Sequence, residues 1–280
     1  MTMNLAENAR RFHRLHDSSE LLVLPNAWDA ASARLIEQAG AHAIATTSAG
    51  MAWSLGYADG ERLPLDELLA ACARIYRVVS VPVSVDIERG YAQTPEQVGA
   101  VAAALIDLGV VGVNIEDGTL PGSAVLTAPA VLGDRIAAIR SVAERAGVPL
   151  FINARTDTYF VPNDDPVARV EETVRRARQY VEAGADGIFV PGISDLREMA
   201  DVASRIGRPL NIYAGFAGVP PIAELRRAGV RRVSLGCGPL QALMAHTRRI
   251  AREVLEQGSY AAMTGEMLSA AEANQLFAHG

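Results

Sequence analysis

The chain of 280 residues contains no lysine, because all 26 of its basic residues are arginine. This absence excludes Schiff-base catalysis and a Walker P-loop, since both depend on a lysine amine. The only two cysteines, Cys72 and Cys237, form neither a C-x-x-C pair nor a zinc-binding spacing. We therefore expect reduced thiols and no metal-thiolate site.

The sequence also lacks the charge and the apolar runs that other classes of protein need. A formal net charge of −6 argues against nucleic-acid binding, which asks for a basic face. No apolar run approaches the ~18 residues of a membrane span, and the amino terminus lacks the apolar segment of a signal peptide. We expect a cytoplasmic protein whose partner is a small molecule, with no nucleic acid and no membrane.

Short apolar, β-rich runs alternate with longer segments of helical spacing. Eight runs are predicted to be strands, and they cover residues 21–25, 42–47, 82–87, 111–116, 149–154, 186–191, 209–213 and 232–236. The helical segments cover residues 29–39, 65–79, 95–108, 133–146, 166–183, 195–206, 219–228 and 239–257. Five helices end in a motif such as EAGA at 182–185, in which the glycine is expected to be the left-handed residue that stops the helix.

This alternation predicts an α/β fold, a (β/α)8 TIM barrel over about residues 20–257, within a single domain of residues 1–280. A short amino-terminal helix precedes the barrel. Residues 258–280 are expected to form a helical tail that packs on the barrel or reaches a neighbouring subunit. An open, doubly wound sheet is the alternative, but no G-x-G-x-x-G motif follows the first predicted strand.

Three acidic residues stand where two consecutive predicted strands end, which is where barrel enzymes build their sites. In the segment VPVSVDIERGY at 81–91, Asp86 and Glu88 point to one side because side chains alternate along a strand. Glu116 ends the next strand and is favoured over its neighbour as the inward group. Buried carboxylates repel unless a cation relieves them, and Mg²⁺ prefers oxygen ligands. We favour a metal site over the alternative, a structural network with arginines such as Arg155.

Arg155 and a hydroxyl-rich turn offer groups that bind anions. Arg155 ends the fifth predicted strand, where a guanidinium clamps a substrate carboxylate or offsets oxyanion charge; a salt bridge to Asp157 or Glu116 is the structural alternative. The segment TTSAG at 46–50 offers hydroxyl and N–H donors, although such turns also satisfy their own backbone. None of the five histidines follows a predicted strand, so we expect catalysis to depend on carboxylates, a metal, hydroxyls and arginine.

Six short segments, in this order, resemble the phosphoenolpyruvate mutase/isocitrate lyase superfamily. They are PNAWDAASA at 25–33, TTSAG at 46–50, SLGYAD at 54–59, VDIERGY at 85–91, NIED at 114–117 and INAR at 152–155. The resemblance implies a Mg²⁺-dependent (β/α)8 enzyme that cleaves a bond next to the carbonyl of a small α-keto or α-hydroxy carboxylate, through an enolate-like intermediate. Members often swap the last helix between subunits, so a homodimer or homotetramer is expected.

The resemblance also implies roles for particular residues. Asp86 would be the main ligand of Mg²⁺, or of Mn²⁺, with Glu88 and Glu116 holding the metal directly or through waters. Arg155 and Glu116 would be the catalytic residues. The substrate site would contain a further set, of which Asp59 also supports the metal shell: Thr46, Thr47, Ser48, Asp59 and Asn211.

The chain departs from the superfamily pattern in the loop after the fourth predicted strand. Lyases of the isocitrate type carry K-[KR]-C-G-H there, with the cysteine as acid and base, whereas residues 118–126 read GTLPGSAVL. Decarboxylation of a β-keto acid such as oxaloacetate does not need this cysteine, because a metal stabilises the enolate and no general base is required. An oxaloacetate decarboxylase-like, Mg²⁺-dependent lyase is therefore the favoured function.

Three alternatives stay open. They are a retro-aldol lyase of the methylisocitrate or dimethylmalate type, a phosphonopyruvate-cleaving enzyme, and a barrel that binds keto acids without turnover. A decarboxylase must also deliver a proton to the enolate carbon, and the candidate donors are water and the hydroxyls of Tyr57, Tyr91 and Tyr213.

Overall fold

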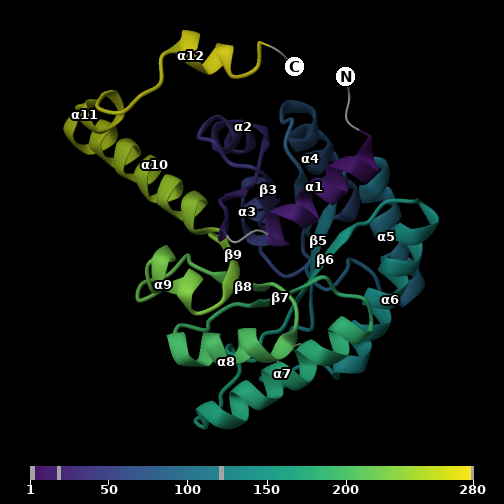
Figure 1. Cartoon of the computed structure of the whole chain (residues 1–280). Coiled ribbons are helices and arrows are strands. Elements are labelled where there is room, and N and C mark those ends of the chain that lie inside the picture. Colours follow the sequence, from purple (N-terminus) through teal and green to yellow (C-terminus); the bar gives the residue numbers. More distant parts are fainter. Residues whose placement is uncertain (1–3, 18–19, 120–122, 279–280) are drawn as a thin grey trace.

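Nine parallel strands form one nearly closed barrel in the computed structural model, which describes residues 4–17, 20–119 and 123–278 (Figure 1). The strands are β1 (Leu22–Leu24), β2 (Asn26–Ala27), β3 (Ile44–Thr46), β4 (Val83–Asp86), β5 (Gly112–Glu116), β6 (Phe151–Arg155), β7 (Gly187–Val190), β8 (Leu210–Tyr213) and β9 (Val230–Ser234). Their order is β1-β9-β8-β7-β6-β5-β4-β3-β2. The predicted (β/α)8 TIM barrel is confirmed.

The first strand of the barrel is split into two pieces, which explains nine strands in an eight-position barrel. β1 pairs with β9, and β2 pairs with β3, so the two pieces together join the ends of the sheet. Pro25 lies between them, and a proline interrupts a strand because it has no N–H to donate. The segment predicted at 21–25 therefore continues through Asn26, which places this side chain at the carboxyl end of the barrel.

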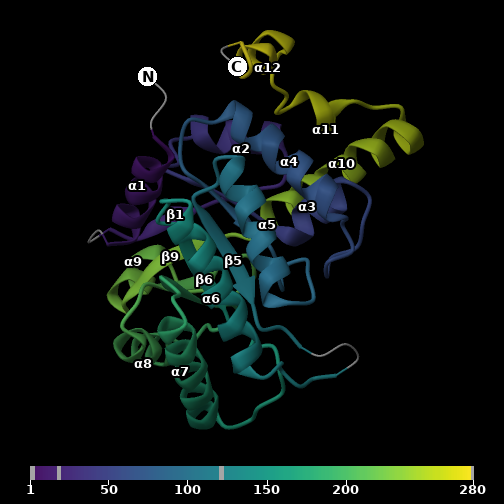
Figure 2. The ribbon, with the colours of Figure 1, turned by 90° about the vertical axis from the view of Figure 1, so that its right-hand side faces the viewer.

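Helices lie around the outside of the strands (Figures 1 and 2). Those that follow the barrel strands are α2 (Ala30–Gln38), α4 (Leu65–Val78), α5 (Pro95–Asp107), α6 (Pro129–Arg145), α7 (Pro166–Glu182), α8 (Leu196–Ile206) and α9 (Ile222–Arg227). The five glycines predicted to stop helices all have a positive φ: Gly40, Gly109, Gly147, Gly184 and Gly229. This left-handed conformation is the one that glycine adopts without steric cost, so the stop signal works as predicted.

Two elements differ from the sequence prediction. A short helix, α3 (Ser48–Ser54), begins within the segment expected to be a loop, and it places the turn after β3 against the barrel mouth. The last strand starts at Val230, two residues before the predicted run, and ends at Ser234. Gly236 follows with a φ of 53°, so the chain turns away from the strand direction there.

The amino-terminal helix α1 (Leu5–Asp17) packs against the barrel interior from the end opposite to the site described below. Its Phe12 and His16 are buried, and the His16 ring stacks on Phe151 of β6 with ring centroids 3.9 Å apart. Burial lowers the pKa of His16 to about 3, so this ring is neutral at physiological pH. The helix therefore fills the amino-terminal end of the barrel, and the carboxyl-terminal end is left for ligands.

The carboxyl-terminal segment points away from the barrel (Figures 1 and 2). It consists of α10 (Gly238–Gln257), α11 (Ala261–Thr264) and α12 (Ala270–Gln275). Leu240 is the one buried residue of α10. The chain end returns toward α2, where Arg34 Nε donates to the carbonyl of Leu276 at 2.8 Å. Across the described part of the chain, every helix is too short or too polar to cross a lipid bilayer.

Candidate active site

A cavity of about 140 Å³ opens at the carboxyl ends of the strands, where the barrel fold predicts a site. Five of the predicted site residues line it: Thr47, Ser48, Asp59, Asp86 and Arg155. Glu88 and Glu116 are next to these residues but do not form its wall. Thr46 and Asn211 also lie outside the lining, and each instead holds a residue that belongs to it.

Asp86 is fixed by three neighbours at the end of β4. Its Oδ2 accepts from the backbone N–H of Ser48 at 3.3 Å, and its Oδ1 accepts from the N–H of Glu88 at 3.1 Å. The Thr46 hydroxyl accepts from the Asp86 N–H at 2.9 Å. Thr46 faces away from the cavity because side chains alternate along β3 and Thr47 faces into it. The structure therefore makes Thr46 a support for Asp86.

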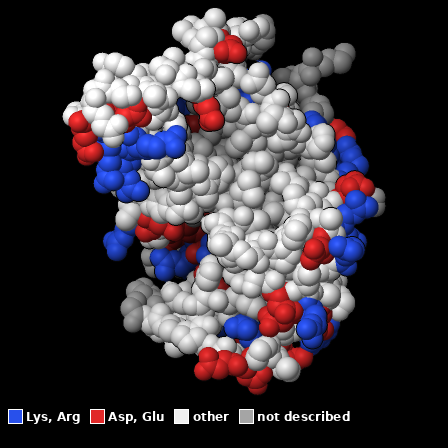
Figure 3. All heavy atoms as spheres, turned by 90° about the vertical axis from the view of Figure 1, so that its left-hand side faces the viewer, with Lys and Arg blue, Asp and Glu red and all other residues white. Residues whose placement is uncertain are grey.

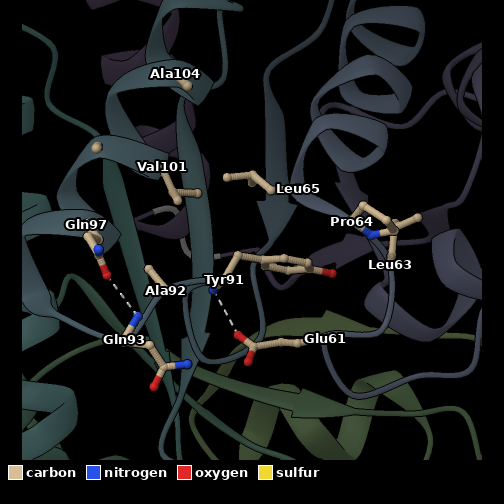
Figure 4. Close-up of a pocket in the computed structure, with 11 residues that line it drawn as sticks. Glu61, Leu63, Pro64, Leu65, Tyr91, Ala92, Gln93, Gln97, Val101 and Ala104 are labelled. Carbon is tan, nitrogen blue, oxygen red and sulfur yellow. Dashed lines mark hydrogen bonds between the residues drawn. The ribbon is translucent and has the colours of Figure 1, made fainter.

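Glu88 accepts hydrogen bonds from two residues, and all three residues have a positive φ angle. Glu61, Glu88 and Tyr91 have φ values of 58°, 47° and 55°, a region that non-glycine residues rarely adopt. The three are linked, because Glu88 accepts from the N–H of Glu61 at 2.7 Å and from the Tyr91 hydroxyl at 3.0 Å. Glu61 accepts in turn from the Tyr91 N–H at 2.8 Å (Figure 4). Such strained residues cost of order 1 to 3 kcal/mol each and tend to occur at functional sites.

Figure 4 shows a second, larger cavity of about 650 Å³ beside this strained turn. Apolar side chains of α4, α5 and the loop before α4 make up most of its wall, together with Glu61 and Tyr91. It shares no lining residue with the central cavity. Because Asp59, Asp86 and Arg155 line the central cavity, that smaller cavity is the candidate active site.

Burial and mutual repulsion disfavour the charged forms of the acids. Burial first, and then the charges of Asp86 and Asp59, raise the pKa of Glu88 to about 7. Burial also raises the pKa of Asp59, with Asp86 as the second cause. Burial raises the pKa of Glu116, although Arg155 opposes this effect. Burial, together with the charge of Asp86 on Glu88 and Asp59, therefore disfavours the ionised forms of these acids.

Arg155 makes the salt bridges that the sequence allowed, and it also lines the cavity. Its Nη1 lies 2.9 Å from Glu116 Oε2, and its Nε lies 2.6 Å from Asp157 Oδ1. Burial alone would lower the pKa of Arg155, but Glu116 and Asp157 together raise it, so the guanidinium stays charged. Two carboxylates thus hold the charged guanidinium in place at the cavity wall.

Asp117 faces away from the cavity and anchors the loops below it. Its carboxylate accepts from the Thr156 hydroxyl at 2.8 Å, the Asp157 N–H at 3.0 Å, Arg176 Nη1 at 3.0 Å and the Tyr180 hydroxyl at 2.8 Å. The alternation along β5 therefore directs Glu116 inward and Asp117 outward, as the strand register predicted. Residues 120–122 of the altered loop lie outside the described residues.

The donor set fits a hard divalent cation. Within the described residues, no three His, Cys, Asp or Glu side chains are arranged to hold a metal by themselves. Mg²⁺ does not require such a cage, because it commonly keeps several waters and uses one or two carboxylates. Asp86, Glu88, Glu116 and Asp59 offer only oxygen donors, and a cation would favour the ionised form of Glu88 that burial and the neighbouring acids disfavour.

Sequence reasoning missed several residues that line the cavity. Among them are Ser234 and Cys237, which come from the end of the last barrel strand and the turn after it, whereas Asn26 was expected from its position after the first strand. The signal for Cys237 was its position directly after the last predicted strand. Asn211, a predicted substrate residue, is buried; its Oδ1 accepts from the Ser234 hydroxyl at 3.2 Å, and its Nδ2 has no partner among the described residues.

Beneath the cavity lies a buried cation that the sequence did not reveal. Arg232 of β9 is fully buried, and its Nη2 donates to Asn114 Oδ1 at 3.3 Å. Burial lowers the pKa of Arg232 to about 9, while the charge of Asp86 acts in the opposite direction. Asn114 lines the cavity, so Arg232 supports the cavity floor and places positive charge near the acids.

Comparison with known proteins identifies the family. The family model described as phosphoenolpyruvate phosphomutase matches residues 12–255. An uncharacterized protein of Mycobacterium tuberculosis is 38% identical over 245 residues, which are 87% of this chain and 88% of that protein. The 2-methylisocitrate lyase of Aeropyrum pernix is 29% identical, covering 88% of this chain and 79% of its own. The oxaloacetate decarboxylase 1 of Pseudomonas fluorescens is 29% identical, covering 87% and 83%.

Solved structures agree with this result. A candidate phosphonomutase from Burkholderia cenocepacia J2315 superposes with a TM-score of 0.85 at 36% identity, covering 91% of this chain and 100% of its own. The structure of a 2,3-dimethylmalate lyase gives a TM-score of 0.84 at 26% identity, covering 97% and 95%. Fold and cavity define a (β/α)8 barrel of the lyase and mutase type. The chain belongs to the phosphoenolpyruvate phosphomutase family, within the phosphoenolpyruvate mutase/isocitrate lyase superfamily.

Proposed function

We propose that this protein is a Mg²⁺-dependent carbon–carbon lyase that decarboxylates oxaloacetate or a closely similar β-keto acid. The observation that carries the proposal is the composition of a small cavity. Its volume of about 140 Å³ is below the ~300 to 1,000 Å³ of typical ligand pockets, which favours a compact substrate. Asp86, Arg155 and the hydroxyls of Thr47 and Ser48 line it, so a cation site and anion-binding groups face the same small volume.

The proposed roles follow from these contacts. Asp86 is the main metal ligand, with Glu88 and Glu116 holding the metal directly or through water, and Mn²⁺ is expected to replace Mg²⁺. The bound metal would chelate the keto oxygen and the adjacent carboxylate, and so offset the charge that develops on the enolate oxygen. Arg155, charged and fixed between two carboxylates, adds positive charge at the reacting end of the substrate. Thr47, Ser48 and Asp59 orient the substrate.

The enzyme assay follows oxaloacetate loss and pyruvate formation by purified protein with Mg²⁺, against the rate with Mg²⁺ alone. Asp86→Ala is the matched control, because it removes the proposed metal ligand and leaves Arg155 in place. We expect metal-dependent release of pyruvate by the wild-type protein that the variant lacks. A wild-type rate no higher than that of the metal alone would exclude the decarboxylase.

A retro-aldol lyase is the second candidate, and it is favoured by the relatives named as 2-methylisocitrate lyase and 2,3-dimethylmalate lyase. These substrates are larger than oxaloacetate, so the small cavity favours them less. Incubation with 2-methylisocitrate and 2,3-dimethylmalate, with detection of pyruvate or another keto acid, separates this function from decarboxylation. The control is the same Asp86→Ala variant.

We also propose that the protein is a homodimer or homotetramer in which α10 and the following segment are covered by a second copy. Leu243, Met244 and Leu255 of α10 are exposed, as are Met267 and Phe277 beyond it. Figure 3 views the side of Figure 1 on which α10 and α11 lie, and it shows a broad uncharged area with charged groups gathered at its edges. Light scattering after size exclusion tests this; a monomer would exclude it.

We further propose that the protein is located in the cytoplasm, because both of its cysteines are free thiols and a reducing compartment keeps thiols reduced.

A further inference from the structure

Decarboxylation leaves an enolate whose carbon must receive a proton, and the structure narrows the choice of donor. The inference therefore rests on the proposed enolate chemistry. The Tyr57 hydroxyl donates to Glu67 at 2.6 Å, and the Tyr91 hydroxyl donates to Glu88 at 3.0 Å. Of the three candidate tyrosines, Tyr213 alone lines the central cavity. Beside it stands a group that the sequence reasoning had not considered, the thiol of Cys237.

Cys237 reaches the cavity from the turn between β9 and α10. It is a free thiol of intermediate exposure and lines the same cavity as Asp86 and Arg155. The other cysteine, Cys72, is buried in the hydrophobic core and is not part of the cavity. The Tyr213 hydroxyl donates to the carbonyl of Gly215 at 3.4 Å. The cavity thus presents one thiol, and the phenol of Tyr213 lines the same wall.

Two hydrogen bonds and a glycine fix the turn that carries this thiol. Asn26 Oδ1 accepts from the N–H of Leu235 and from the N–H of Gly236, each at 2.8 Å. Gly236 has a φ of 53°, and a Cβ at this position would lie 2.6 Å from Cε2 of Tyr213. A side chain larger than glycine would displace the Tyr213 ring. The first strand, the last strand and Tyr213 therefore pack around the turn that precedes Cys237.

Two features favour the thiol of Cys237 over the phenol of Tyr213 as the proton donor. Cys237 is the residue that precedes the first turn of α10, a helix of 20 residues, and its side chain makes no capping hydrogen bond. The positive end of a helix stabilises a nearby anion such as a thiolate. Burial first, and then Cys237, raise the pKa of Tyr213 to about 12, so this phenol is a poorer acid than usual. An ordinary thiol, with a pKa near ~8.5, is a better acid than a phenol.

We propose that Cys237 is the catalytic acid that protonates the enolate carbon, and that Tyr213 positions its thiol. When the bond to the leaving carboxylate breaks, its electron pair forms the enolate and CO₂ departs. The enolate carbon then takes the proton of the Cys237 thiol, which gives the keto acid and a thiolate. Water returns a proton to the thiolate, and the hydroxide left behind combines with CO₂ as bicarbonate. A thiol in the turn after the last barrel strand thus replaces the cysteine that is absent from the altered loop.

The direct test runs the protonation step backwards. If the thiol delivers a proton to the enolate, its thiolate removes a proton from pyruvate in the reverse step, so the Mg²⁺-loaded enzyme should exchange the methyl protons of pyruvate with D₂O, as followed by ¹H NMR. We expect Cys237→Ala to slow this exchange by about 100-fold or more, the usual contribution of a positioned acid or base. Cys237→Ser, which preserves the shape, should also be slow. Cys72→Ala is the matched control and should exchange like the wild type.

Tyr213→Phe separates positioning from catalysis. It should lower the exchange rate less than Cys237→Ala does, with little change in the pyruvate concentration that gives half the maximal rate. A second readout does not depend on turnover. Iodoacetamide should label Cys237 selectively, oxalate with Mg²⁺ should protect it, and Tyr213→Phe should change the labelling rate.

Two outcomes would overturn the inference: wild-type exchange retained in Cys237→Ala, or no pyruvate exchange by the wild-type enzyme. The proposed function fails separately. If the wild-type protein exchanges pyruvate protons through Cys237 but leaves oxaloacetate intact, the acid is confirmed and the decarboxylase is excluded. If the wild-type protein decarboxylates oxaloacetate while Cys237→Ala exchanges pyruvate protons at the normal rate, the decarboxylase function is retained. The proton donor is then a group other than Cys237.

Discussion

Replacing Glu88 by glutamine tests whether the acid cluster destabilises the metal-free fold. The pKa of Glu88 is about 7 in the fold, compared with an ordinary value of 4.5. A carboxyl group whose pKa is higher in the folded than in the unfolded chain binds more protons when folded. The fold therefore loses stability as the pH rises from 4.5 to 7, and the loss is complete above pH 7.

The size of this effect follows from the two pKa values. At about 1.4 kcal/mol for each pH unit, the full interval corresponds to roughly 3 kcal/mol, of which about 2.5 kcal/mol falls between pH 5 and pH 8. Glutamine does not titrate, so Glu88→Gln should lack this loss. The variant also weakens a hydrogen bond from Glu61 or Tyr91, but that cost is independent of pH and cancels when the two pH values are compared.

Urea denaturation in EDTA at pH 5 and pH 8 measures the free energy of unfolding of both proteins. We expect Glu88→Gln to gain about 2 to 3 kcal/mol relative to the wild type between these pH values. Saturating Mg²⁺ should shrink the gain, because a cation favours the ionised carboxylate. Glu171→Gln, at an exposed pair with Arg205, is the control and should show no gain. Equal pH dependence of wild type and Glu88→Gln would refute the reasoning.

Three further substitutions test separate parts of the site. Asp86→Asn should abolish the stabilisation by Mg²⁺, which for the wild type reaches about 2.7 kcal/mol at 100 times the dissociation constant; a normal thermal shift would contradict its role as a ligand. Arg155→Lys should lower kcat/KM by about 100-fold or more in the oxaloacetate assay, because lysine keeps the charge but loses the forked donors; wild-type kinetics would argue for a structural role. Asp117→Asn should cost about 3 kcal/mol of unfolding free energy in urea, since it breaks a buried pair with Arg176, while leaving Mg²⁺ binding unchanged; a loss of binding would show that it belongs to the metal site.

Local sequence patterns were sufficient to predict the barrel and the acidic residues at the carboxyl ends of its strands. The alternation of apolar strands and helices, with glycine stops such as Gly184, predicted the element order, because each signal acts over a few neighbouring residues. Alternation along β4 and β5 also placed Asp86 and Glu116 at one end of the barrel. Their charge makes them visible in the sequence, and their strands are adjacent in the sheet. The six family segments added the expected magnesium chemistry.

Tertiary structure decided the details that depend on contacts across the closed barrel. Thr46 and Thr47 are equivalent in the sequence, yet the first supports Asp86 and the second lines the cavity, because the register of β3 sets which side faces inward. The strained turn at Glu61 and Tyr91 was equally invisible, since a positive φ at a non-glycine residue has no sequence signal.

The same reason explains why Cys237 escaped sequence reasoning. It lies near Asp86 only because β1 pairs with β9 and so brings the last strand beside the first, where Asn26 fixes the turn. The sequence by itself determined the barrel and the acids at its mouth, through periodicity and charge. Only barrel closure decided which side chains share the cavity, because that depends on pairing between strands at opposite ends of the chain.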